Sequence, residues 1–528
     1  MRNLELPGRS TVHSLNGMAA TSQPLASQAA VAVLQAGGNA IDAAVTASAV
    51  LCVVEPQSTG IGGDCFCLIS PKGSGVVAYN GSGRAPAALS AEILKDQGLE
   101  KIPDQSPHAV TIPGAIDAWA RLLADHGTIS LGDALQPAIR LASDGYTIHH
   151  RVHEDFASNV DYLQTDTNAA RIFLPGGKPP PVGGVHHQPE LAATMAAIAD
   201  QGRDGFYGGE IAQDMVDRLR ELGGLHTMAD FENAAGEWVT PIKTSYAGHD
   251  VYECPPNGQG IVALVMLNIL KGFDLQALAP LSAERLHLEI EAARLAYRDR
   301  DRILADPAMA DVPVEQWLSD EHAAACRAHI SPSKAMDPLP ASDFPNHRDT
   351  VYLSVVDKDR NAVSFINSTF YSFGSGIVAP KSGIVLHNRG QGFTLEDGHP
   401  NQLAPGKRPM HTIIPAMLMK EGRAAMPFGV MGGHYQACGH AHLLTNLFEY
   451  GMDLQEAIDF PRVFPFDGHV EVEHTVPEAV RAELTAMGHN LVQPAKPIGG
   501  AQAIAINWDT GVLSGGSEPR KDGMAIGY

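Results

Sequence analysis

A segment rich in proline, serine and aspartate interrupts the chain, and it limits the fold more than any other feature. Residues 331–349 read SPSKAMDPLPASDFPNHRD and have neither helical nor strand periodicity. Such composition is typical of an exposed, mobile linker. A strand rich in β-branched residues begins at once with Thr350, and a turn at 357–361 leads to a second strand at 362–367. The sequence therefore predicts a hairpin directly behind a linker.

The remaining segments alternate between helical and strand-like patterns. Residues 25–54 predict two helices separated by Gly37-Gly38-Asn39, with Asn39 capping the second helix. Further helices are predicted at 114–145, 190–222, 259–272 and 283–305, and strands within 65–80 (a pair), 377–387, 413–419 and 501–508. This mixture predicts an α+β fold in which helices cover sheet layers.

Composition and charge exclude several classes of protein. The 528 residues are 44% hydrophobic and 18% charged, which is ordinary for a globular protein. A formal net charge of -22 argues against nucleic acid or an anionic membrane as a partner, because both require basic surfaces. The N-terminal residues lack a basic segment followed by an apolar run, so we predict no signal peptide and a cytoplasmic location.

The common catalytic and metal-binding patterns are absent. The sequence contains no G-x-S-x-G, H-E-x-x-H or phosphate-binding P-loop, and the Ser-x-x-Lys at Ser331–Lys334 lies inside the linker. The 23 histidines and six cysteines show no spacing typical of a metal site. We therefore expect free thiols, no metal and no cofactor. Thr350 alone would be read as an ordinary packing residue at the start of a strand.

Several motifs resemble the γ-glutamyltranspeptidase family and change that interpretation. The stretch from Thr350 to Val363 is similar to the start of the family's small subunit. In the family's order, the other matching segments are Gly37–Val45, Glu55–Gln57, Gly60–Gly63, Thr111–Gly114, Gln136–Ala138, Phe206–Gly208, Pro255-Pro256, Ala305–Pro307, Phe373–Ile377, Lys407–Pro409, Gly432-Gly433, Glu518–Arg520 and Gly527-Tyr528. The resemblance covers nearly the whole chain.

This resemblance implies a fold and a maturation step. The fold is the four-layer αββα sandwich of the N-terminal nucleophile hydrolases. The chain is expected to cut itself between Asp349 and Thr350 into a large subunit, 1–349, and a small subunit, 350–528, which together form one domain. The two subunits would be each other's partners, and a dimer of such heterodimers is left open by the sequence.

The chemistry of such a nucleophile follows from acid–base principles. A threonine hydroxyl needs a base, and the α-amine freed by cleavage before Thr350 can be that base, because its unperturbed pKa is about 7.7–8.0. The resemblance implies that Ser368 hydrogen-bonds the nucleophile, where the family has threonine. It also implies that Gly432 and Gly433 form the oxyanion hole, in which backbone N–H groups approach the developing charge.

The residues for substrate recognition depart from the family pattern. Ser82 stands where the family's carboxylate-binding arginine is expected, and Arg84 lies two residues later. His411-Thr412 replace the family's serine pair, and Phe370 and Gly392 replace an asparagine and an acidic residue. Within Asn388-Arg389-Gly390, Arg389 could bind a substrate carboxylate bidentately. An ion pair between Arg389 and a neighbouring acidic residue is the alternative.

The sequence therefore predicts a self-processing amidohydrolase that cleaves a small amide carrying a carboxylate. The segments 366–376 and 388–390 are closer to the oxamate amidohydrolase branch than to true γ-glutamyl transferases. The short segment between Phe393 and Pro409 leaves the site open to water, which favours hydrolysis. A γ-glutamyltransferase or glutathione hydrolase, a cephalosporin or glutaryl acylase, and an uncleaved binding homologue without catalytic activity are the alternatives.

Overall fold

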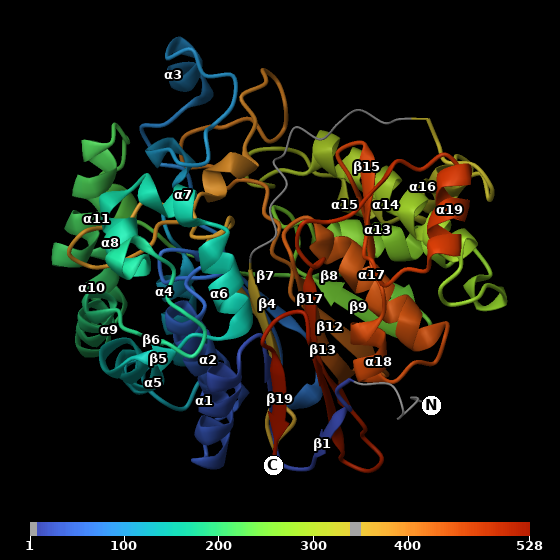
Figure 1. The fold of residues 1–528 in the computed structure, drawn as a ribbon, viewed down its shortest axis with the longest axis horizontal. Coiled ribbons are helices and arrows are strands. Elements are labelled where there is room, and N and C mark those ends of the chain that lie inside the picture. Colours follow the sequence, from blue (N-terminus) through green and yellow to red (C-terminus); the bar gives the residue numbers. More distant parts are fainter. Residues whose placement is uncertain (1–7, 338–349) are drawn as a thin grey trace.

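The computed structural model describes residues 8–337 and 350–528. In these two ranges the long strands form two seven-stranded antiparallel sheets that lie face to face (Figure 1). The first sheet has the order β19 (Met524–Gly527), β2 (Met18–Thr21), β10 (Val351–Val356), β11 (Ala362–Ser368), β3 (Asp64–Ser70), β4 (Val77–Gly81) and β7 (Glu237–Val239). The second has the order β1 (Val12–Ser14), β18 (Leu513–Ser517), β17 (Gly500–Ile506), β13 (Arg423–Met431), β12 (Ala416–Lys420), β9 (His249–Glu253) and β8 (Ile242–Tyr246).

Helices cover the outer face of each sheet (Figure 1). Those beside the first sheet include α1 (Pro24–Gln35), α2 (Ala40–Val54), α4 (Ala115–His126), α5 (Leu131–Asp144), α9 (Pro189–Gln201), α10 (Arg203–Tyr207) and α11 (Gly209–Glu221). Those beside the second include α13 (Gly260–Leu270), α14 (Ala283–Ile303), α16 (Asp320–Arg327), α17 (Tyr435–Phe448), α18 (Leu454–Asp459) and α19 (Glu478–Ala486). No helix in the described ranges is both long and apolar enough to span a bilayer.

Alternation along the strands divides the interior into separate cores. In β10, Val351, Leu353 and Val355 pack against the helices beside the first sheet, whereas Tyr352 and Val356 face the second sheet. In β13, Phe428 and Val430 contact the helices on the other side. Successive side chains of a strand point to opposite faces of its sheet. Because apolar residues occupy both faces, each sheet lies between two hydrophobic cores. The predicted αββα sandwich is confirmed.

The local signals at the predicted helix starts and hairpins are also confirmed. Asn39 caps α2, since its side chain accepts from the N–H groups of Ile41 and Asp42. The Asp42 carboxylate in turn accepts from the backbone N–H of Asn39. The predicted hairpins are β3–β4 and β10–β11. All six cysteines are buried and free.

Three predictions of secondary structure need correction. The strand predicted at 377–387 is reduced to isolated bridges, from Val378 to Val385 and from Leu386 to Gly62, because Pro380 lacks an N–H and Gly383 takes a positive φ of 67°. The strand predicted from 413 begins only after Pro415, at Ala416. The helical stretch 190–222 is three helices, which glycines at 202 and 208 separate.

Both sides of the predicted linker contribute to the same sheets. β10 lies between β2 and β11, and Ser354 pairs with Ala20. Residues 331–337 form a turn with a bridge between Ser331 and Lys334, and the remainder of the predicted linker, 338–349, lies outside the described residues. The segments before and after this gap are therefore interleaved in one structure.

Candidate functional site

Thr350 lies directly before β10, near the middle of the first sheet, and is fully buried. Its hydroxyl is 3.2 Å from the hydroxyl of Ser368, the last residue of β11, because the register of the hairpin places these two strand ends together. The Ser368 oxygen also accepts from the backbone N–H of Phe370 at 3.0 Å. The structure thus brings together the predicted nucleophile and its predicted partner, while Asp349 lies outside the described residues.

Arg389 provides the positive charge of the site. It is fully buried, its Nη1 donates to the Thr412 hydroxyl at 3.0 Å, and its guanidinium carbon lies 4.2 Å from the centre of the Phe370 ring. Among the described residues, no acceptor is hydrogen-bonded to its Nε or Nη2. Burial lowers the pKa of Arg389 to about 9, and the Asp64 carboxylate opposes that shift, so the group is a cation at neutral pH.

Asp64, the first residue of β3, is the acidic residue that lies within 4 Å of Arg389 among the described residues. Its Oδ1 accepts from the N–H groups of Gly83 and Gly114, and its Oδ2 lies 3.0 Å from His411 Nε2 and 3.7 Å from Arg389 Nε. Burial alone would raise the pKa of Asp64, but attraction to His387, whose Nδ1 lies 3.4 Å from Oδ2, and hydrogen bonding to His387 and His411 hold it well below its usual range. The ion pair considered for Arg389 is therefore present at long range, without a hydrogen bond.

Asp64 was not predicted from the sequence as a site residue. It follows the glycine motif Gly60–Gly63 and is the one charged residue of the strand DCFCLIS. A carboxylate at the start of an apolar strand was the available signal, because a fully buried charge requires partners.

His411 and Thr412 connect the carboxylate to the glycine turn. Burial, with a further contribution from Arg389, lowers the pKa of His411 to about 3, so its imidazole is neutral when it contacts Asp64. The side-chain amide of Gln259 donates to the carbonyls of Thr412 and Gly433 at 2.9 and 3.0 Å. One continuous set of contacts thus leads from Thr350 to the glycine pair.

Gly432 and Gly433 form the turn between β13 and α17. Their φ angles are +125° and +59°, a region that favours glycine. A Cβ on Gly432 would lie 2.8 Å from the Cα of Gly499. The close packing against Gly499 and the positive φ therefore both require glycine at Gly432.

The other predicted substrate residues differ in position. Ser82 is buried beside Gly83 and accepts from the Asn257 amide at 3.1 Å. Asn388 supports the loop after β11, since its Oδ1 accepts from the Tyr371 N–H at 3.1 Å. Arg84 points elsewhere: it donates to the Gly406 carbonyl at 3.2 Å and lies 3.5 Å from Asp306, with 39% of its side chain exposed. The structure does not bring Arg84 to Arg389.

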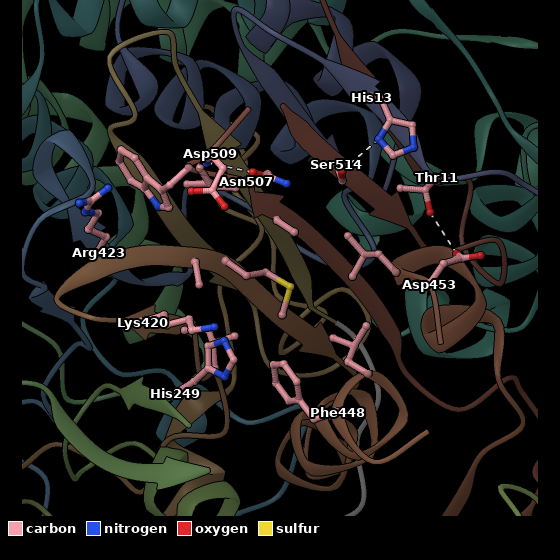
Figure 2. A pocket seen from close by; sticks show the side chains of 18 of the residues that line it. Thr11, His13, His249, Lys420, Arg423, Phe448, Asp453, Asn507, Asp509 and Ser514 are labelled. Carbon is pink, nitrogen blue, oxygen red and sulfur yellow. Dashed lines mark hydrogen bonds between the residues drawn. The ribbon is translucent and has the colours of Figure 1, made fainter. Parts of the chain in front are cut away.

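A large surface cavity lies apart from these residues. It has a volume of about 1120 Å³ over the second sheet, and its lining residues include His13, His249 and Arg423 (Figure 2). Thr350, Ser368 and Arg389 do not line it. Several of its polar groups are paired with each other: Thr11 donates to Asp453, and His13 contacts the Ser514 hydroxyl. Its chemistry is therefore unrelated to the buried site.

Two facing sheets between helical layers, with a hydroxyl at the start of an inner strand, define the class of N-terminal nucleophile hydrolases. The sequence pattern of the gamma-glutamyltranspeptidase family matches residues 26–528. The chain belongs to the γ-glutamyltranspeptidase family, and this family and the relatives described next are hydrolytic enzymes.

Three similar proteins illustrate the range of the family. The crystal structure of cephalosporin acylase from Bacillus halodurans superimposes with a TM-score of 0.93 at 40% identity, covering 100% of this chain and 99% of the other. The glutathione hydrolase-like YwrD proenzyme of Bacillus subtilis is 38% identical over 95% of this chain and 97% of its own length. The oxamate amidohydrolase proenzyme of Klebsiella pneumoniae is 33% identical over 98% and 99%.

Proposed function

We propose that this protein is a self-processing amidohydrolase that cleaves a small amide carrying a carboxylate. Arg389 is the observation that carries this proposal. A fully buried guanidinium whose Nε and Nη2 donate to no acceptor among the described residues has a high desolvation cost, which a bound carboxylate would offset. It stacks on the ring of Phe370, whose backbone N–H donates to Ser368 of the hydroxyl pair.

Maturation begins in the uncut chain. The Thr350 hydroxyl attacks the carbonyl carbon of Asp349, the peptide nitrogen takes the proton, and an ester replaces the peptide bond. Water then hydrolyses the ester, which frees the hydroxyl and leaves an α-amine on Thr350. Ser368, whose oxygen is 3.2 Å from the nucleophile, orients the attacking hydroxyl. Because the amine exists only after this cut, the precursor lacks the base for later turnovers.

Turnover uses the same atoms on an external amide. The α-amine accepts the hydroxyl proton while Thr350 Oγ1 attacks the substrate carbonyl, and the amine then protonates the leaving nitrogen. The backbone at Gly432 and Gly433 stabilises the oxyanion. Water hydrolyses the acyl-threonine. Arg389 binds the substrate carboxylate in a bidentate manner and so fixes the acyl group against the nucleophile.

The relatives named above support amide hydrolysis. Which acyl group the enzyme accepts is to be determined by experiment. We favour an oxamate-type amide because Ser82 and Gly392 stand where the family holds the two charges of a glutamyl group. The test is a comparison of kcat/KM for oxamate, a glutaryl amide, glutathione and a γ-glutamyl anilide. Faster turnover of the two γ-glutamyl compounds than of oxamate and the glutaryl amide would contradict the proposal.

Processing has its own test. On a denaturing gel the purified 56.0 kDa chain should yield fragments of the sizes of 1–349 and 350–528. Thr350→Ala should remain one band without amidase activity, and Thr350→Ser should still be cut, because serine keeps a hydroxyl there. A wild-type chain that stays intact would favour the uncleaved binding homologue.

A further inference from the structure

A second group of reactive side chains lies in the helical layer outside the second sheet. Asp299 is on α14, and His322 and Cys326 are on α16. His322 and Cys326 are four residues apart, so they share one face of their helix, which packs against α14. The carboxylate, imidazole and thiol atoms all lie within 4.8 Å of one another.

The three side chains converge on a single ring nitrogen. His322 Nε2 is 3.1 Å from Asp299 Oδ2 and 3.6 Å from Cys326 Sγ. This nitrogen carries either one proton or one lone pair, so it cannot donate to the carboxylate and accept from the thiol together. Asp299 is 4% exposed, and its Oδ2 accepts no hydrogen bond from any described residue despite the short contact with His322. The carboxylate oxygen Oδ2 of Asp299 and the sulfur of Cys326 are therefore both directed toward Nε2 of His322.

These distances match those of a tetrahedral zinc site. Bond lengths of about 2.0–2.1 Å to nitrogen and about 2.3 Å to sulfur, at a tetrahedral angle, separate the two ligand atoms by about 3.6 Å. Two oxygen or nitrogen ligands are separated by about 3.3 Å in the same geometry. The observed 3.6 and 3.1 Å separations require only small adjustments.

A proton relay does not explain this arrangement. A Cys-His-Asp relay uses both ring nitrogens, one for the thiol and one for the carboxylate. Here Nε2 of His322 faces both groups.

A nearby cluster with a similar composition shows the contrast. His287 Nδ1 is 2.7 Å from His489 Nε2, and His287 Nε2 is 2.7 Å from the Ser331 carbonyl, so each nitrogen of His287 has its own partner. Glu291 accepts from the Met336 N–H at 2.7 Å. Hydrogen bonds alone account for that cluster, which anchors residues 331–336. They do not account for the group at Asp299.

We propose that Asp299, His322 and Cys326 bind a zinc ion, with water as the fourth ligand. Arg298 holds Asp299 Oδ1 at 2.9 Å, which turns Oδ2 toward the histidine, as an outer partner of a metal ligand does. His322 has 24% of its side chain exposed, so the ion and its water can enter from solvent. A carboxylate and a thiolate balance the charge of the ion. Burial favours the neutral thiol and raises the pKa of Cys326 to about 11, so binding must displace a proton.

The proposed ion would link two helices at a defined place in the chain. α16 is the last helix before the gap at 338–349, and α14 is the long helix beside it. A ligand set drawn from both would fix the end of the N-terminal fragment to the helical layer. This role is independent of Thr350, so it can be tested whether or not the chain cuts itself.

Cobalt provides the decisive measurement, because a cobalt–thiolate bond gives a charge-transfer band in the near ultraviolet. The whole protein is stripped with a chelator and titrated with Co²⁺, and Zn²⁺ is then added in competition. The variants are Cys326→Ser and His322→Gln, and the matched control is His329→Gln, an exposed histidine on the same segment. We expect one equivalent of cobalt to produce the band in the wild type and in His329→Gln.

Cys326→Ser should lose the band, and His322→Gln should bind zinc more than about tenfold less tightly. Zinc should raise the Tm of the wild type and of His329→Gln but not that of Cys326→Ser. If saturating cobalt gives no thiolate band in the wild type, the proposal is wrong. Equal zinc affinities for His322→Gln and the wild type would overturn it as well, and His322 is exposed enough for that variant to fold.

Discussion

Two buried arginines of this protein differ in how completely their guanidinium groups are hydrogen-bonded. Arg285, on α14, is 0% exposed, and its guanidinium bonds Glu289, Thr445, Asn446 and the Pro280 carbonyl. Arg389 is equally buried, yet within residues 8–337 and 350–528 it donates one hydrogen bond, to Thr412, and its Nε and Nη2 donate none. The same side chain is thus saturated with hydrogen bonds in one place, whereas in the other we propose that it binds the carboxylate of the substrate.

The largest expected effect is on stability at the saturated arginine. Arg285→Met should lower the free energy of unfolding by about 3–5 kcal/mol, because Glu289 is left buried without its cation. Denaturant unfolding measures this loss, and kcat/KM of the folded protein should stay unchanged. Arg389→Met is the matched control. An equal loss of stability in both variants would remove the distinction between the two arginines.

The reciprocal effect is on catalysis at the open arginine. Arg389→Met should weaken transition-state binding of a carboxylate-bearing amide by about 2–5 kcal/mol. This loss corresponds to a fall in kcat/KM of about 30-fold to several thousand-fold. Steady-state kinetics on oxamate measures it. Processing before Thr350 should continue, which separates substrate binding from maturation. Unchanged kinetics in a processed Arg389→Met enzyme would refute its role.

Acid should weaken the region around Arg285. Arg285 and His442 outweigh burial and lower the pKa of Glu289 to about 2, below an unfolded value of about 4.3. The pair therefore contributes its full stability above about pH 4.3 and loses it as the pH falls toward 2, by about 3 kcal/mol. Glu289→Gln mimics the protonated state, so the stability difference between it and the wild type should shrink over that interval. A constant difference would contradict this assignment.

The smallest expected effect concerns the ring beneath Arg389. Phe370→Leu should weaken substrate binding by about 0.5–2 kcal/mol, a rise in KM of about 2- to 30-fold, because the cation–π contact is lost. Leucine has the same restriction at the positive φ of 80° as phenylalanine, so backbone strain stays matched. A fall in kcat with KM unchanged would show that the ring acts on chemistry instead.

The sequence predicted the features of the fold that are determined by residues close together in the chain. The Asn39 cap, the hairpin after Thr350 and the apolar helices are local patterns, and the structure confirms them. The strand at 377–387 was wrong because proline and positive-φ glycine outweigh a run of apolar residues. Family motifs, rather than periodicity, identified the four-layer sandwich.

The site was harder to predict because its contacts join distant parts of the chain. The register of β11 against β3 sets Ser368 opposite Asp64, and His411 reaches that carboxylate from 347 positions away. The sequence could name Arg389 as a carboxylate ligand. Only the packing of Phe370 and Thr412 around it determines which of its N–H groups stay open.

Because Tyr528 lies at the edge of the first sheet, the chain can be circularly permuted. The backbone of Tyr528 is hydrogen-bonded to Asn16 and Gly17. The strand β19 therefore ends beside the connection between β1 and β2. A short splice from Tyr528 to the chain ahead of Asn16, with translation started at position 350, would give a circular permutant that keeps both sheets. Once its initiator methionine is removed, this permutant would carry a free threonine amine as soon as it is synthesised, and the base that we propose for turnover would not require an internal cut.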